Sequence, residues 1–388
     1  MSKKDSLLKG NIRQYVMVIA LIVVIILFQF STHGVLLKPL NISNLISQNA
    51  YILILAIGML LCILTGGNVD LSVGSVAGFV GAISAIMMLK MHIPILPTII
   101  ASLILGLVIG CWQGFWIAYV GVPAFIATLA GMLIFRGLTL VVLHGTSLAP
   151  LPSGYTFLAS GFLPDIMKVG KLNTLAIICG IVASIFYVAR EMNNRNNKKK
   201  YGFEISSYKV FIPQVVGILV VLNAFTFALA SYKGIPMVLV IVIILVLIYS
   251  FITMKTIPGR HIYAFGGNAK AAQLSGVNTK KVMFWVYANM GVMAALAGII
   301  FTGRLNSATP KSGVNFELDA IGACFIGGAS TSGGVGTVVG AMVGGLLMGV
   351  LNNGMSIMGI SIDWQQTIKG FVLLAAVAFD VYSKSKSK

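Results

Sequence analysis

The stretch KTIPGRHIYAFGGNAKAAQLSGVNTKK, residues 255–281, is a polar segment with strongly apolar sequence on both sides. It contains five basic residues and no acidic residue. It is too long for a tight turn between two membrane-spanning helices, and its charge is typical of a cytoplasmic loop. The sequence therefore predicts a cytoplasmic element here that another protein binds.

The rest of the chain has the composition of a polytopic membrane protein. Of its 388 residues, 58% are hydrophobic and only 9% are charged. Apolar runs of the roughly 20 residues needed to cross a bilayer recur along its whole length. We therefore predict an all-α integral membrane protein with about 10–12 transmembrane helices. Spans are expected near residues 15–37, 47–65, 72–89, 95–119, 123–143, 173–190, 211–231, 236–253, 282–302 and 365–383.

Residues 319–351 hold too many glycines for one plain helix. A break is expected near Gly333 and Gly334, with a spanning helix on each side and the turn facing the cytoplasm. A broken helix cannot face lipid, because its unpaired backbone groups would lack hydrogen-bond partners there. The glycine-rich segment is therefore predicted to pack within the protein or to line a cavity.

The net charge of +18 arises from 27 basic and nine acidic residues. Eighteen of the basic residues lie in four segments, namely the first 13 residues, 190–209, 255–281 and the last five residues. This clustering follows the positive-inside rule and favours anionic lipid headgroups, not nucleic acid, as the counter-charge. Both termini are therefore predicted to be cytoplasmic. The proline-containing loop 144–172 is predicted to be extracytoplasmic and without regular helix.

We interpret residues 1–388 as one transmembrane domain without a soluble domain. Its predicted parts are five spans in 15–143, an extra helix pair in 173–231 with a basic cytoplasmic loop at 190–209, the cytoplasmic loop 254–281, and C-terminal spans in 282–383.

The sequence contains no motif that would supply energy or catalysis. It lacks a GxxxxGK[ST] phosphate loop and the HExxH and GxSxG motifs. The four cysteines lie far apart without CxxC spacing, which indicates neither a disulfide framework nor a zinc site. We predict no catalytic residue, no metal and no cofactor bound by this chain. If the protein pumps a solute uphill, either another chain hydrolyses ATP or an ion gradient drives it.

Charged residues inside apolar sequence are the candidates for the translocation pathway. A charge at the bilayer centre costs on the order of 3 kcal/mol even on the mildest scale. The charged residues of this kind are Asp70, Arg136, Glu317, Asp319, Asp363 and Lys369. Asp70, Arg136 and Asp363 are the pathway candidates, and Gln113 is a further candidate as a hydroxyl ligand. Asp70 follows a glycine-containing turn, so capping of the next helix is the interpretation we favour over solute contact. For Arg136, a pathway role and a structural buried pair both remain open.

Glu317 and Asp319 are expected to flank the outer mouth of the protein. There they would contact a partner such as a binding protein, or belong to a plain solvated loop. The solvated loop is the simpler of the two interpretations.

Three motifs carry a resemblance to a known family. IYAFGGNAKAAQLSGV at 262–277 resembles the cytoplasmic coupling loop of permease subunits of bacterial ABC-type monosaccharide importers. LTGGNVDLSVGSVAG at 64–78 and VPAFIATLAGMLIFRGLTL at 122–140 resemble two further signatures of that group. The resemblance runs almost from end to end. WQGFWIAY at 112–119 and the extra helix pair look like the xylose and multiple-sugar permeases.

The resemblance implies a type II ABC-importer-like permease in a bacterial cytoplasmic membrane. A short helix of the loop would dock on an ABC ATPase, which binds ATP and magnesium. An extracytoplasmic sugar-binding protein would deliver a monosaccharide, and two permease copies would form a homodimer. Lys270 departs from the family's older Glu-Ala-Ala pattern. The implied coupling residues are Gly266, Gly267, Asn268, Ala271, Ala272, Leu274, Ser275 and Gly276.

The main alternative is an ion-coupled secondary transporter. In that case Asp70 or Asp363 would bind the ion, and the loop 254–281 would be a passive linker. A membrane enzyme acting on lipid is a more remote alternative, because the four histidines are scattered along the chain.

Overall fold

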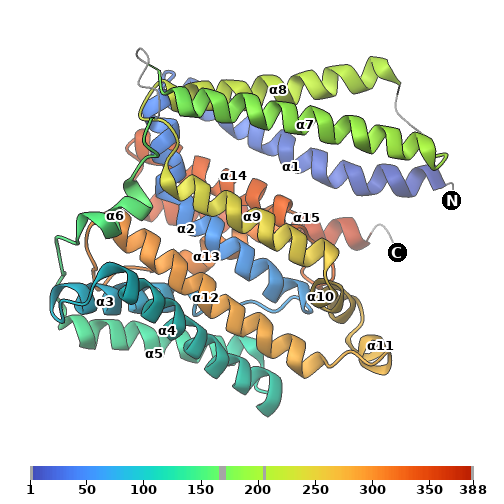
Figure 1. The fold of residues 1–388 in the computed structure, drawn as a ribbon. Helices are drawn as coiled ribbons and strands as arrows, with labels where there is room; N and C mark the ends of the chain where they lie inside the picture. Colours follow the sequence, from blue (N-terminus) through green and yellow to red (C-terminus); the bar gives the residue numbers. More distant parts are fainter. Residues whose placement is uncertain (1–2, 166–171, 204–206, 386–388) are drawn as a thin grey trace.

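The computed structural model describes residues 3–165, 172–203 and 207–385, and it is largely helical there (Figure 1). No β-strand forms in these ranges, which confirms the prediction of an all-α protein. The elements of the first half are α1 (Lys3–Ser31), α2 (Pro39–Leu64), α3 (Val73–Leu89), α4 (Ile95–Phe115), the π-helical turn η1 (Trp116–Val120), α5 (Ala124–Leu143) and α6 (Ser153–Ser160). Those of the second half are α7 (Thr174–Lys200), α8 (Tyr208–Ala230), α9 (Met237–Lys255), α10 (Ile257–Gly267), α11 (Ala269–Leu274), α12 (Thr279–Leu305), α13 (Phe316–Ile326), α14 (Val338–Ile357) and α15 (Ile362–Ser385).

Eight helices in the described ranges are long and apolar enough to cross a membrane. They are α2, α4 together with η1, α5, α7, α8, α9, α12 and α14. Two shorter apolar helices are the stretch Met17–Ser31 of α1 and the whole of α3. α15 is 24 residues long, which exceeds the roughly 20 residues of a spanning helix. The chain is therefore a multi-pass membrane protein.

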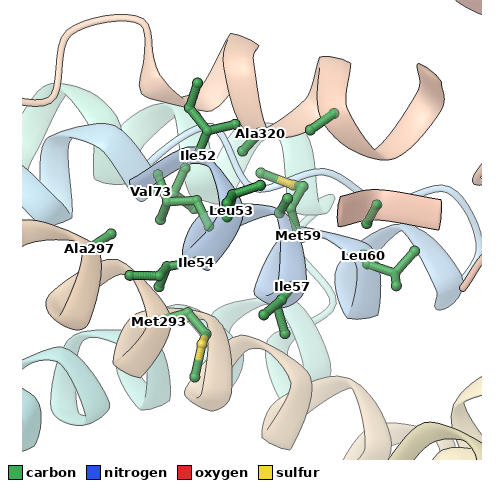
Figure 2. Packing of buried hydrophobic residues seen from close by; sticks show 14 of the residues in the cluster. Ile52, Leu53, Ile54, Ile57, Met59, Leu60, Val73, Met293, Ala297 and Ala320 are labelled. Carbon is green, nitrogen blue, oxygen red and sulfur yellow. The ribbon is translucent and has the colours of Figure 1, made fainter. Parts of the chain in front are cut away.

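α2 lies at the centre of the bundle. Its apolar stretch is 83% buried, whereas the matching share is 11% for α7 and 0% for α8. α12, α13 and α14 pack around α2, and Figure 2 shows the side chains that they bury together, among them Ile54, Ile57 and Met293. The apolar residues left exposed on α7 and α8 are suited to contact with lipid, where apolar surface carries no penalty.

α4 crosses α12 at short range because both helices carry small residues at the crossing. A Cβ atom on Gly106 would lie 2.5 Å from the carbonyl oxygen of Gly291. A Cβ atom on Gly110 would lie 2.5 Å from the carbonyl oxygen of Tyr287. The four-residue spacing of the two glycines places them on one face of α4, so the two backbones can touch.

α2 begins at Pro39, well before the residue 47 expected from hydropathy. Its first turns carry polar side chains, and the side-chain amide of Asn41 finds hydrogen-bond partners inside the protein. Asn41 Nδ2 donates to the carbonyl oxygen of Leu36 and to Asn353 Oδ1, both at 2.8 Å. The polar beginning therefore continues the helix because α14 supplies hydrogen-bond partners for it.

Two predicted loops contain helix. Residues 190–200 of the basic segment continue α7, whose last turn carries Lys198, Lys199 and Lys200, where positive charge interacts favourably with the helix dipole. The loop 144–172 contains α6, which begins directly after Pro152. Proline is tolerated at a helix start, so it does not prevent this short helix. Residues 166–171 of that loop lie outside the described ranges.

The glycine-rich segment is broken as predicted, between α13 and α14. Gly333 and Gly334 both adopt positive φ, at 80° and 70°. However, α13 has only 11 residues, or about 16 Å of helix, which is too short to cross a bilayer. The prediction of a spanning helix on each side of the break is therefore wrong for the first side, and α13 is a half-length helix packed within the protein.

Candidate coupling and translocation site

The polar segment 255–281 folds into two short helices, α10 and α11. Thr256 Oγ1 accepts from the amide of Gly259 at 3.4 Å and caps α10. Asn268 Oδ1 accepts from the amide of Ala271 at 2.9 Å and caps α11. Asn268 therefore separates two helices where the motif predicted one, and α11 contains the expected Lys270–Ala272 stretch.

The far side of this segment is an exposed tip formed by Leu274, Ser275 and Gly276. The side chain of Leu274 is 84% exposed, and Gly276 has a φ of 86° with open space around it. Ala272, by contrast, is buried against the protein. An exposed leucine beside small residues is a surface on which a partner helix or groove can pack closely.

At Gly266, α10 packs directly against the backbone of Leu64 and Gly334. A Cβ atom on Gly266 would overlap the carbonyl oxygen of Leu64 and lie 2.5 Å from the amide nitrogen of Gly334. The Gly334 amide also donates to the Leu64 carbonyl at 3.0 Å. We call these three residues the backbone junction. It joins α10, the end of α2 and the break between α13 and α14.

Tyr263 adds a side-chain contact beside the backbone junction. Its hydroxyl donates to the carbonyl oxygen of Gly336 at 2.7 Å. Burial raises the pKa of Tyr263, so the hydroxyl stays protonated and remains a donor. α10 is thus attached at two points to the segment before α14.

Two of the predicted pathway residues, Asp70 and Gln113, both form hydrogen bonds with Ser72. Asp70 Oδ1 accepts from the Ser72 amide at 2.8 Å and from the Ser72 hydroxyl at 2.6 Å. Gln113 Nε2 donates to the Ser72 hydroxyl oxygen at 2.7 Å. Because Ser72 directly precedes α3, Asp70 organises the start of that helix. The same contacts place an amide and a carboxylate side by side within the bundle.

Arg136 and Glu317 carry opposite charges that stay unpaired. Glu317 is 5% exposed, and its Oε2 atom is buried without a hydrogen-bond partner in the described part of the chain. The Nη2 atom of Arg136 is also buried and has no hydrogen-bond partner among the described residues. Arg136 is near enough to act on the Glu317 carboxylate electrostatically, yet no ion pair joins them among the described residues. Buried polar groups without partners are costly. Arg136 therefore remains a candidate for contact with a polar solute. Glu317, which was expected at the outer mouth, becomes a further candidate.

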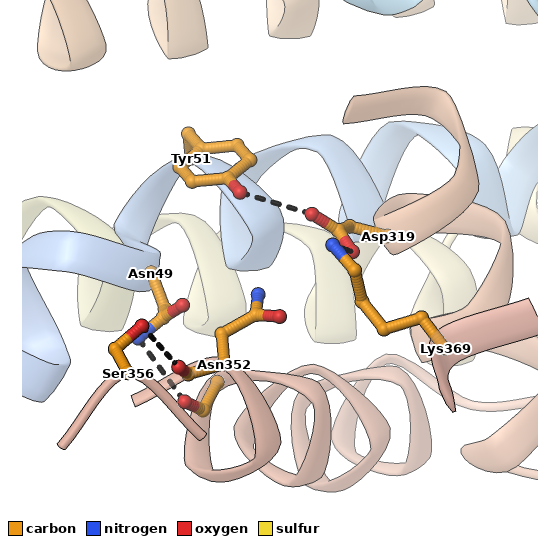
Figure 3. A network of polar contacts seen from close by, with 7 residues as sticks. Asn49, Tyr51, Asp319, Asn352, Ser356 and Lys369 are labelled. Carbon is orange, nitrogen blue, oxygen red and sulfur yellow. Dashed lines mark hydrogen bonds and ion pairs between the residues drawn. The ribbon is translucent and has the colours of Figure 1, made fainter. Parts of the chain in front are cut away.

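Asp319 is fully engaged inside the protein (Figure 3). Lys369 Nζ donates to its Oδ1 at 2.9 Å, and the Tyr51 hydroxyl donates to its Oδ2 at 3.0 Å. Asp319 is only 2% exposed, and Glu317 is buried as well. Their burial does not fit the expected solvated contact with a binding protein. Both acids occupy the first turn of α13, where the positive end of the helix dipole favours them.

Asp363 lies apart from these groups. It is exposed in the first turn of α15, and it touches neither Asp70 nor Arg136 in any contact of the described residues. The structure thus brings Asp70 and Gln113 together through Ser72 and separates Asp363 from them. Among the described residues, no hydrogen bond or ion pair joins Arg136 to Glu317. No group of three metal-ligating side chains occurs within the described ranges.

Three contributing residues were absent from the sequence prediction. Ser72 had a usable signal, because a serine two residues after an aspartate commonly forms a local turn. Tyr263 is the single tyrosine in the polar segment 255–281, which could have marked it. Tyr51 lies within an apolar run, and nothing in the local sequence indicates that its hydroxyl reaches Asp319.

Comparison with known proteins defines the class of this chain. Residues 41–377 match the family described as branched-chain amino acid transport system permease component. The chain belongs to this family and is a non-catalytic, membrane-spanning permease subunit of an ABC-type importer. No solved structure matches the chain.

Individual relatives narrow the class further. The chain is 40% identical to the xylose transport system permease protein of Haemophilus influenzae over 377 residues, which cover 97% of this chain and 98% of the relative. It is 38% identical to the corresponding xylose permease protein of Escherichia coli strain K12, covering 97% and 94% of the two chains. The ribose import permease protein of the same strain is 34% identical, covering 88% and 85%.

Proposed function

We propose that this chain forms the translocation pathway of an ATP-driven importer for a pentose, with xylose as the substrate. The observation that carries this proposal is the 40% identity to a xylose permease over 97% of the chain. The ribose permease is less similar and covers a smaller share. The unpaired polar atoms of Arg136 and Glu317 suit a solute whose hydroxyl groups both donate and accept hydrogen bonds.

The exposed tip of α11 and its neighbours would dock on the ATPase. Two features support this role, namely the exposure of Leu274 and the direct contact of α10 with the ends of other helices. A short element held against spanning helices can pass on movement of a partner as rigid-body displacement. ATP and magnesium would be bound by the ATPase and not by this chain.

The tip of α11 would lie in the cytoplasm together with both termini. Figure 1 shows both ends of the chain, the end of α7 and the pair α10–α11 at one end of the bundle. Those are the segments in which the basic residues gather, as the positive-inside rule requires of a cytoplasmic side. The extracytoplasmic binding protein would deliver sugar at the opposite end, and a second copy of this chain would complete the pathway.

The experiment that tests the proposal is uptake of radiolabelled xylose into proteoliposomes. The vesicles hold this chain and its ATPase, with the binding protein supplied on the outer side of the permease. We expect uptake that requires ATP on the ATPase side, that continues when ion gradients are collapsed, and that excess ribose inhibits only weakly. ATP-driven uptake of ribose in preference to xylose would overturn the substrate assignment.

The same assay separates the proposal from ion-coupled transport. A secondary transporter would move xylose with this chain alone and would stop when the ion gradient is removed. Replacement of Asp363 by Asn should leave ATP-driven uptake unchanged, because its exposed side chain lies apart from the buried polar groups. Gradient-driven uptake that Asp363→Asn abolishes would establish the alternative.

A further inference from the structure

A cleft lies between α9, α10 and α12. Figure 1 shows α10 at the end of the bundle that carries the short helices. It has a volume of about 480 Å³ and a largely apolar wall that includes Leu61, Tyr249 and Ile252. Its polar residues include His261 and Lys281. A cavity of this size lies within the range of about 300–1,000 Å³ typical of sites for small molecules. Its wall includes Gly276 of the exposed tip, but none of the predicted pathway residues Asp70, Gln113 and Arg136.

The polar side of the cleft favours an anion. The first turns of α10 and α12 both border it, and neither contains an acidic residue. Each helix start carries the positive end of a helix dipole. Lys281 adds a positive charge to the first turn of α12, where the dipole disfavours it. None of the residues that line the cleft is acidic.

The apolar wall of the cleft favours a hydrocarbon chain. Trp285 borders the cleft and is 61% exposed, as is typical of an aromatic residue at the level of lipid headgroups. The hydroxyl of Tyr249 donates a hydrogen bond to Asn289 Oδ1. The aromatic ring of Tyr249 therefore contributes apolar surface to the cleft. An occupant must therefore combine an anionic group with an apolar tail.

We propose that this cleft binds an anionic phospholipid of the cytoplasmic leaflet. The phosphate lies at the starts of α10 and α12 beside Lys281, and one acyl chain lies along Ile252 and Trp285. A free phosphate would satisfy the charge but leave the apolar wall empty. A zwitterionic phospholipid would fill the wall but bring a positive group toward Lys281. The bound lipid would connect the coupling helices with α9 and α12, so that the anionic lipid content of the membrane tunes transport.

The test uses the full chain in nanodiscs of phosphatidylcholine that contain a small share of phosphatidylglycerol with a photoreactive acyl chain. We expect labelling of peptides that contain Ile252 and Trp285, displaced by unlabelled phosphatidylglycerol and not by added phosphatidylcholine. Lys281→Gln should weaken this labelling about fivefold, the effect of one basic residue near an anionic surface. Lys270→Gln on α11, outside the cleft, is the matched control and should leave labelling unchanged.

A second variant tests the apolar wall of the cleft while the positive charge of Lys281 is kept. Ile252→Trp fills the apolar wall and keeps Lys281, so it should abolish labelling while the thermal unfolding of the protein stays near that of the parent. Equal labelling by a photoreactive phosphatidylcholine would overturn the proposal. So would displacement of the probe by inorganic phosphate, or crosslinks across the cleft to a second copy of the chain.

Discussion

At the scale of single residues, the carboxylate of Asp319 is the clearest case of a charge made tolerable by donors from other helices. Its two oxygens are bound by Lys369 of α15 and Tyr51 of α2. The side chain of Lys369 is 19% exposed and that of Asp319 is 3% exposed. Removal of one member of a buried ion pair leaves the other charge without compensation, and this is more destabilising than removal of both.

Lys369→Met should therefore lower the free energy of unfolding by about 3–5 kcal/mol, because Asp319 stays buried with a single donor. Thermal unfolding of the detergent-purified protein would measure the loss. The double variant Asp319→Asn with Lys369→Met should regain most of the stability. A single variant as stable as the parent would show that the pair is not needed for folding.

Gly266 permits a second residue-scale prediction with a matched control next to it. Gly266→Ala should abolish uptake, because its Cβ atom would overlap the carbonyl oxygen of Leu64 at the backbone junction. Overpacking of this kind costs about 1–3 kcal/mol and displaces backbone. Gly267→Ala should transport normally, because no atom lies within 4 Å of its added Cβ atom. Equal uptake by the two variants at equal membrane levels would contradict the prediction.

At the scale of elements, the turn after α11 depends on the left-handed backbone of Gly276. Its φ of 86° disfavours residues with a Cβ atom, although the space around it is open. Strain and not a clash should therefore decide which substitutions are accepted.

Gly276→Val should abolish uptake while the protein still inserts into the membrane, since a β-branched residue costs at least about 1–2 kcal/mol in this conformation and would distort the tip. Gly276→Asn should keep most of the activity, because asparagine visits the left-handed region more readily. Uptake and membrane levels of both variants are the measurements. Normal uptake by the valine variant would remove the tip from the proposed docking surface.

Long apolar elements were predictable from sequence, whereas polar interruptions were not. α3, α5 and α9 lie within a few residues of the spans expected from hydropathy, because apolar length alone defines them. The start of α2 was missed because Asn41 looks like a loop residue until Asn353 of α14 is placed beside it. The helical end of α7 was missed because charge was interpreted as loop, although lysine is a good helix former.

The candidate site shows the same division. The segment 255–281 was recognisable from charge and motif, and so was the link of Asp70 to the start of the next helix. The contact of Gly266 with Leu64 could not be predicted, because about 200 residues separate them and no local pattern records such a contact. Glu317 and Asp319 were placed at a solvated mouth because nothing near them in the sequence indicates their burial. The partners of Asp319, which are Tyr51 and Lys369, lie far from it in the chain.

At the scale of the whole molecule, α7 and α8 form a separate layer. They pack mainly against each other, and α8 also contacts α2. Figure 1 shows the pair at one edge of the bundle. Their membrane stretches are 11% and 0% buried. The ends of the pair adjoin, because the Asn173 amide donates to the Ala230 carbonyl at 2.9 Å.

Excision of residues 175–228 with a short glycine linker should therefore leave the remaining bundle folded. An even number of spans is removed, so the orientation of the later helices is preserved. We expect the shortened chain to insert and to unfold in one transition near that of the parent, as measured by thermal unfolding in detergent. Aggregation of the shortened chain, with the linker length varied as a control, would show that the pair supports the core.

The backbone junction has a consequence for how such permeases diversify. Contacts made by side chains can lengthen or shorten through rotamer changes, but a contact between main-chain groups has no such freedom. Leu64, Gly266 and Gly334 meet through backbone atoms, so the sequence around them can change little without altering their spacing. The side chain of Gln113, by contrast, meets Ser72 through rotatable bonds and is less restricted. Under the proposed function, relatives would be able to exchange one sugar for another while the contact of α10 with Leu64 and Gly334 keeps its geometry.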